Sequence, residues 1–226
     1  FISLRKWKRS HDGLGMPYLL LSCLSLFWFS CSVIPDLSDP AVFTDAKESA
    51  VDLSTLERKF MYGMFYLYVD QEGEPFTGWV KSKHDTGTLK QLGFLKKGRK
   101  EGVWMDWHSA SVKQSDIYWT EDRMEGPFTV WHPNGNLKVV GQTKDGEVDG
   151  SWAEYYPDGQ LAYRSTNKMG HLVDIKVWKP DGSICQESNV VGGNGSFLRY
   201  FEDGSIEHQR VFEHGVETSR ETFNQR

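Results

Sequence analysis

Glycine recurs in this sequence at a spacing of about 24 residues, and this repeat limits the chain to folds that are built from similar units. The units start at Gly78, Gly102, Gly126, Gly150, Val173 and Gly195. Nine residues after these starts stand Gly87, Ser111, Gly135, Gly159, Gly182 and Gly204. Twenty residues after them stand Gly98, Asp122, Gly146, Gly170, Gly193 and Gly215. Self-similarity of this kind indicates a repeat architecture in which each unit is buried only by its neighbours.

The middle glycine of each unit lies in a turn motif, which reads Pro-Asn-Gly-Asn at residues 133–136 and Pro-Asp-Gly-Gln at residues 157–160. Asn-Gly and Asp-Gly tolerate the two positive φ angles of a type I′ hairpin turn. An aromatic strand precedes each motif and an aliphatic residue follows it, which indicates a β-hairpin. We therefore expect structural turn glycines with positive φ at Gly87, Gly135, Gly159, Gly182 and Gly204.

The predicted fold is all-β, an elongated single-layer antiparallel sheet of about six stacked hairpins over residues 61–219. Copies three and four, at residues 126–137 and 150–161, resemble the MORN repeat variant family, whose units run roughly Gly-x-Trp-x-x-Tyr-x-x-(Asn/Asp)-Gly-x-Leu. Copy two departs from this pattern at Ser111, and copy five is one residue short. The resemblance implies a scaffold of stacked hairpins, and some bacterial members of the family are described as antitoxins. Neither role brings a catalytic motif.

Two aromatic columns run through the copies and point to a binding surface. One lies two residues after the unit starts and includes Trp104 and Trp152; the other lies five residues after them. Side chains alternate between the faces of a strand, so the two columns should project from opposite faces. We expect Trp104 and Trp152 to be structural and the second column to contact a partner, with the candidates Trp107, Trp131, Tyr155, Trp178 and Tyr200. The alternative is that twist or a bulge brings both columns into one curled core.

The N-terminal segment has the pattern of an export signal. A basic run at residues 5–9 precedes an apolar stretch at residues 18–29, and Cys31 follows that stretch. The end of the stretch resembles a bacterial lipobox, so we interpret residues 1–31 as a lipoprotein-type signal with lipidation at Cys31. A cleaved secretory signal and an uncleaved anchor remain alternatives. This interpretation predicts a lipoprotein that is anchored in the membrane of the cell envelope.

The ends of the repeat domain are expected to be less regular. Residues 32–60 contain Pro35 and Pro40, which should break an early helix, and they read as a tether with a possible short helix at about residues 45–60. Residues 220–226 read as a C-terminal tail.

Charge and composition exclude several kinds of function. The net charge of the chain is −5, although the N-terminal segment is basic through residues 5–9. The remaining, folded part is therefore more acidic than the whole chain and should repel nucleic acid. His84, His108 and His132 share one column, but equivalent residues of successive hairpins lie nearly 10 Å apart, so we expect a solvated ladder and no shared metal. Cys185 is expected to be buried in a strand, without a disulfide. No cofactor is expected.

The sequence therefore predicts a non-catalytic, exported repeat scaffold that mediates a protein–protein interaction at the bacterial cell envelope. Two alternatives remain open. The first is an antitoxin or immunity protein whose acidic surface neutralises a basic toxin. The second is a glycan-binding or cell-wall-binding protein that uses exposed tryptophans.

Overall fold

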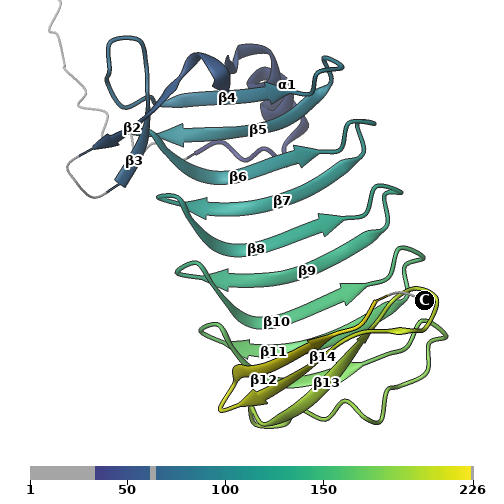
Figure 1. Cartoon of the computed structure of the whole chain (residues 1–226). Coiled ribbons are helices and arrows are strands. Elements are labelled where there is room, and N and C mark those ends of the chain that lie inside the picture. Colours follow the sequence, from purple (N-terminus) through teal and green to yellow (C-terminus); the bar gives the residue numbers. More distant parts are fainter. Residues whose placement is uncertain (1–33, 62–64, 225–226) are drawn as a thin grey trace, which may run out of the picture. The chain divides into compact units, whose positions relative to one another are not determined.

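The structure is a computed structural model that describes residues 34–61 and 65–224. The expected export signal and the lipidation residue Cys31 lie outside the described residues. Three β-sheets and one short α-helix make up the described part of the chain (Figure 1). The prediction of an all-β fold with a long antiparallel sheet of stacked hairpins is confirmed.

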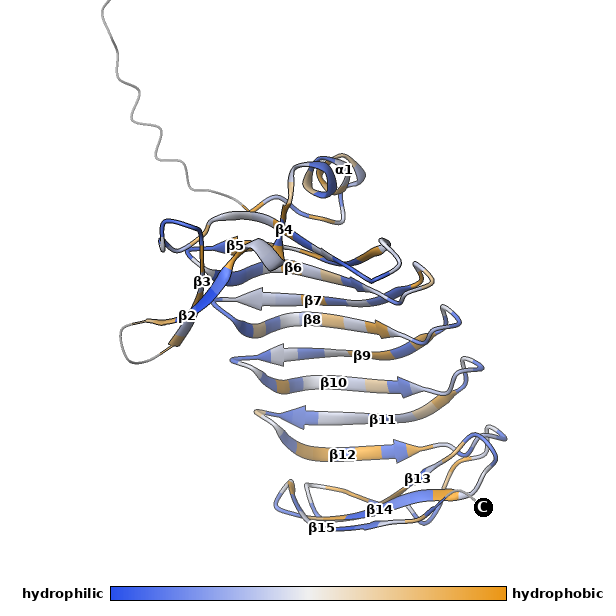
Figure 2. Ribbon diagram, turned by 45° about the horizontal axis from the view of Figure 1, so that its top comes forward, coloured by the Kyte–Doolittle hydropathy of each residue, from blue (hydrophilic) through white to orange (hydrophobic). Residues whose placement is uncertain are grey.

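Ten strands form the largest sheet. Nine of them pair in chain order, each antiparallel to the next: β4 (Gly78–Lys83), β5 (Leu89–Lys96), β6 (Arg99–Trp107), β7 (Lys113–Thr120), β8 (Arg123–Trp131), β9 (Leu137–Lys144), β10 (Glu147–Tyr155), β11 (Leu161–Lys168) and β12 (His171–Val177). The tenth strand, β1 (Val51–Asp52), pairs with β4 in parallel. Hydrophilic and hydrophobic segments alternate along many of these strands (Figure 2).

The Pro-Asn-Gly turns have a different geometry from the predicted type I′. The Gly135 amide donates to the His132 carbonyl at 2.9 Å, and the His132 amide donates to the Asn136 carbonyl at 2.8 Å. Gly135 has a φ of 89°, but Asn134 does not have a positive φ. The arrangement is a type I turn followed by a left-handed residue, which inserts a β-bulge where the strand register shifts. The φ angles of the equivalent residues are 82° at Gly87, 94° at Gly159, 80° at Gly182, 84° at Gly204 and 61° at Ser111.

The turns at the opposite ends of the hairpins have the type I′ geometry, with two positive φ angles in succession. In the turn between β9 and β10 these are 53° at Asp145 and 89° at Gly146. The Asp145 amide donates to the Glu125 carboxylate of the preceding copy at 2.7 Å. Equivalent bonds, each spanning 20 residues, are accepted by the side chains of Thr77, Glu101, Asp149 and Asn194. The acidic glycine turns are therefore held together by hydrogen bonds between successive copies.

A helix begins where the sequence suggested a tether. α1 (Pro40–Ser49) follows Asp39, whose carboxylate caps the helix by accepting from the Ala41 amide at 2.8 Å. Pro40 occupies the first helical turn, where an N–H would have no partner within the helix, so proline begins this helix. The expectation that Pro40 breaks an early helix is wrong, and the possible short helix is present at residues 40–49 instead of at about residues 45–60.

Both faces of the sheet are covered at its N-terminal end. α1 packs on one face, in a buried cluster with Leu92, Val103 and Met105. The 3-10 helix η1 (Leu53–Thr55) and β3 (Phe65–Val69), which pairs with β2 (Glu57–Met61), contribute to a cluster with Trp104 on the other. Trp104 also lies over Gly93 of the neighbouring strand, where a Cβ atom would collide with the indole.

A second layer covers the C-terminal end of the sheet. β13 (Gly195–Tyr200), β14 (Ile206–Glu213) and β15 (Val216–Thr222) form a separate sheet that shares a buried cluster with β12. Arg199 of this sheet forms an ion pair with Glu154 of β10. The single-layer prediction is therefore wrong at this end, and β15 runs past residue 219, into the expected tail.

The second layer arises because the fifth copy does not complete its hairpin. Trp178 and Ile184 form a single β-bridge, and the Ser188 amide then donates to the Cys185 carbonyl, which turns the chain away from the sheet. Cys185 is buried, as expected, but in this turn instead of in a strand. Its thiol lies 3.1 Å from the Tyr200 hydroxyl.

Candidate interaction surface

The two aromatic columns lie on opposite faces of the sheet. Trp104 is 1% exposed and packs with Val80 and Leu95. Trp107 belongs to the cluster on the α1 face, where its ring centroid lies 5.9 Å from that of Phe43. The single curled core is therefore wrong for Trp104 and Trp107, but in the C-terminal cluster Ile175 and Phe197 of the first column pack together with Tyr200 of the second.

The face that α1 covers at one end can be followed along the sheet by strand register, because directly opposed residues share a face. From Met105, which packs beside α1, the register passes through Asp116, Thr129, Val140 and Ala153. The three buried clusters of the described residues include none of these last three side chains. Val140 is 36% exposed. Beyond α1 this face is accessible at Thr129 and Val140, whereas the small Ala153 side chain is buried.

Each partner-binding candidate on this surface is paired with an aliphatic residue of the next strand. Trp131 lies opposite Leu137, and Tyr155 lies opposite Leu161. Trp131 and Tyr155 are half-buried, and the Lys113 ammonium lies 5.4 Å from the centre of the Trp131 ring. We call Trp131, Leu137, Val140, Tyr155 and Leu161 the apolar stripe.

The other three candidates have different surroundings. Trp107 is half-buried beneath α1, so α1 covers part of the surface that the sequence predicted would contact a partner. Tyr200 is 7% exposed and belongs to the C-terminal cluster, and burial raises the pKa of its hydroxyl. Trp178 is half-buried beside Ile184, which is 53% exposed. Strand patterning could not reveal either cover, because α1 lies outside the repeating pattern and the sixth copy, which forms the C-terminal sheet, carries the same glycine pattern as the copies in the large sheet.

The histidine column joins successive copies and is not a solvated ladder. The Nε2 atoms of His84, His108 and His132 lie 2.8, 3.3 and 2.9 Å from the carbonyl oxygens of Trp107, Trp131 and Tyr155. Tyr156 takes the same place in the next copy, and its hydroxyl donates to the Trp178 carbonyl at 3.0 Å. Each of these four side chains therefore forms a hydrogen bond with the backbone carbonyl of a second-column aromatic residue in the next copy. Among the described residues, no group of three or more His, Cys, Asp or Glu side chains is placed to hold a metal ion.

The fold and its inter-copy bonds define a β-hairpin repeat scaffold. The family described as MORN repeat variant matches residues 124–145 and 148–166, which supports the assignment of these copies as MORN repeats. The match covers the two copies in which the sequence pattern is most complete. A search of curated proteins finds no match. No helix in the described part of the chain has the length and apolar character needed to cross a membrane.

Proposed function

We propose that this protein is a non-catalytic scaffold that binds a protein partner through the apolar stripe. The observation that carries the proposal is the row of Trp131, Tyr155 and their aliphatic partners on a face that the buried clusters leave open. Tryptophan and tyrosine dominate the binding energy of many protein interfaces, because they bury a large rigid surface.

The rigidity of this surface supports the same proposal. Hydrogen bonds from His108, His132 and Tyr156 hold the backbone carbonyls of Trp131, Tyr155 and Trp178 of the second column. Residues held in place before binding lose less conformational entropy when a partner arrives. A preformed row of this kind suits a folded protein with a complementary apolar surface.

We also propose that the protein acts in the bacterial cell envelope, to which it is exported and anchored by lipid on Cys31. This part of the proposal rests on the sequence of residues 1–31, where a basic run and an apolar stretch precede the cysteine. It predicts that the partner is also a component of the envelope.

The test compares a stripe variant with a core variant after crosslinking in membranes. Trp131→Ala and Tyr155→Ala should leave the melting temperature nearly unchanged and weaken partner binding by about 2 kcal/mol or more. Trp104→Ala should instead lower the unfolding free energy by about 3–5 kcal/mol. The proposal is wrong if partner recovery is the same for the wild type and both folded stripe variants. Elution of the partner by free sugars would support a glycan-binding protein instead.

A further inference from the structure

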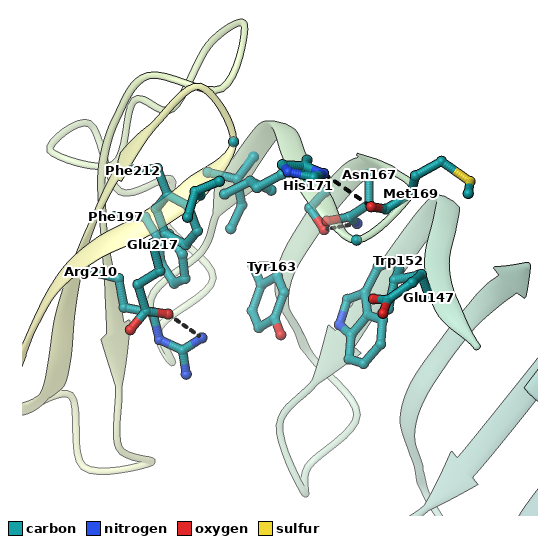
Figure 3. A pocket seen from close by; sticks show the side chains of 17 residues that line it. Glu147, Trp152, Tyr163, Asn167, Met169, His171, Phe197, Arg210, Phe212 and Glu217 are labelled. Carbon is teal, nitrogen blue, oxygen red and sulfur yellow. Dashed lines mark hydrogen bonds and ion pairs between the residues drawn. The ribbon is translucent and has the colours of Figure 1, made fainter. Parts of the chain in front are cut away.

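A cavity of about 570 Å³ lies between the end of the large sheet and the C-terminal sheet (Figure 3). Its walls carry the rings of Trp152 and Tyr163 from β10 and β11, and those of Phe197 and Phe212 from β13 and β14. A volume of this size and walls that combine aromatic and aliphatic side chains with a few polar groups are typical of sites that bind a small organic molecule. The apolar stripe contributes none of its residues to this cavity.

One wall of the cavity holds an arginine whose hydrogen-bonding capacity is only partly used. The Nε atom of Arg210 is buried without a partner among the described residues, and its Nη1 atom lies 3.7 Å from Glu217. Glu217 meanwhile makes two short bonds to Arg220, at 2.7 and 2.9 Å. Burial, with a smaller contribution from the like charge of Arg220, lowers the pKa of the Arg210 guanidinium, whose carbon lies 5.7 Å from the centre of the Phe197 ring. A buried cation normally has a close, hydrogen-bonded counter-ion.

The opposite part of the cavity presents a second free donor. The indole N–H of Trp152 is buried and has no hydrogen-bond partner with good geometry among the described residues. The Tyr163 hydroxyl itself donates to Glu154 at 2.7 Å. Figure 3 shows the Tyr163 ring between Arg210 and Trp152. The cavity thus contains two hydrogen-bond donors, Arg210 Nε and Trp152 Nε1, with the Tyr163 ring between them.

We propose that this cavity binds a small aromatic carboxylate that carries a second acceptor oxygen at its far end. The carboxylate pairs with Arg210, the ring packs against Tyr163 and Phe197, and the far oxygen accepts from the Trp152 indole. This ligand supplies acceptors where the cavity has free donors, which is the condition for a favourable buried hydrogen bond.

The same inventory argues against two other ligand classes. Sugar hydroxyls would bring several donors, whereas Glu217 already accepts from Arg220 and Ser165 already accepts from Asn167, which leaves few acceptors besides the Glu147 carboxylate. A phosphate dianion would meet one free arginine together with the carboxylates of Glu147 and Glu217, which also line the cavity. A monoanion with an apolar body fits this balance of charge best.

The test is calorimetric titration of the full chain with 3-(4-hydroxyphenyl)propionate. Three matched probes accompany it: the amide of the same acid, 3-phenylpropionate, which lacks the far oxygen, and inorganic phosphate. We expect the hydroxylated acid to bind more tightly than 3-phenylpropionate, and about tenfold or more tightly than its amide. Equal binding of acid and amide, tighter binding of phosphate, or no binding of either acid would overturn the proposal.

Substitutions of residues that line the cavity test whether the acid binds there. Arg210→Gln should weaken binding of the acid by about tenfold or more. Trp152→Phe keeps an aromatic ring and should remove the preference for the hydroxylated acid over 3-phenylpropionate. Trp119→Phe is the control, because the Trp119 indole N–H is also buried without a partner but the residue lies outside both the cavity and the apolar stripe, and this variant should bind the acid like the wild type.

The melting temperature of each variant shows whether it is folded. If Arg210→Gln does not fold, Trp152→Phe decides, and an unchanged preference in that variant would contradict the proposal. The result is independent of the proposed scaffold function, because a variant can lose the acid and still recover the partner.

Discussion

Replacing His132 with phenylalanine tests whether the histidine column holds the copies together. His132 donates from Nε2 to the Tyr155 carbonyl at 2.9 Å and so connects the third copy to the fourth. Phenylalanine keeps a ring of similar size but has no donor. A hydrogen bond contributes about 1 kcal/mol net, and an acceptor left without its partner adds to the loss. We expect His132→Phe to lower the unfolding free energy by about 1–2 kcal/mol.

The loss can be measured by urea unfolding and located by amide hydrogen exchange. A change of 1 kcal/mol corresponds to a decrease in melting temperature of about 2–4 °C for a domain of this size. Because each copy is supported by its neighbours, amides of β8 to β11 should lose protection before those of β4 and β5. Hydrogen exchange therefore separates a local loss between copies from a general destabilisation.

Two matched variants control this experiment. His132→Tyr should keep much of the stability, because Tyr156 occupies the same place in the next copy and donates to the Trp178 carbonyl. His171→Phe changes an exposed histidine outside the column and should stay within about 0.5 kcal/mol of the wild type. If His132→Phe is no less stable than His171→Phe, the column does not connect the copies and this reasoning is wrong.

Three other predictions follow from the turns, the C-terminal sheet and the signal. Ser111 has a φ of 61°, so Ser111→Gly should raise the unfolding free energy by about 1 kcal/mol. Gly159 has a φ of 94°, so Gly159→Val should lower the unfolding free energy by about 1–2 kcal/mol or more. Urea unfolding measures both changes, and changes of the same sign would contradict the turn geometry. Burial, with a smaller contribution from Arg210, lowers the pKa of His208 to about 4, so the unfolded chain takes up this proton at higher pH than the folded one, and stability should fall as the pH is lowered from about 6.5 to about 4. His208→Gln should flatten that part of the stability profile, and a profile of unchanged slope would exclude this histidine as the cause. Cys31→Ser should release the protein from the membrane fraction, and a variant that stays membrane-bound with its signal intact would favour an uncleaved anchor.

The sequence by itself determined the repeating part of the fold. Glycine at fixed intervals marks both kinds of turn, and alternation along the strands separates Trp104 from Trp107 on opposite faces. These features are local, because turn conformation and side-chain direction depend on a few neighbouring residues. The type I′ assignment was wrong at the Pro-Asn-Gly turns, because a type I turn followed by a bulge requires a positive φ only at the glycine.

Only the tertiary structure decided which parts of the repeat are covered. α1 lies on Trp107, and the C-terminal sheet lies on β12 and buries Tyr200. The free donors of Trp152 and Arg210 meet in one cavity, although they are far apart in sequence. Such contacts depend on how segments of different sequence pack against a sheet whose strands all carry a similar pattern. The pattern identifies the two faces, but it cannot show where each face is covered, because α1 lies outside the repeat and the sixth copy carries the same pattern as the strands that it covers.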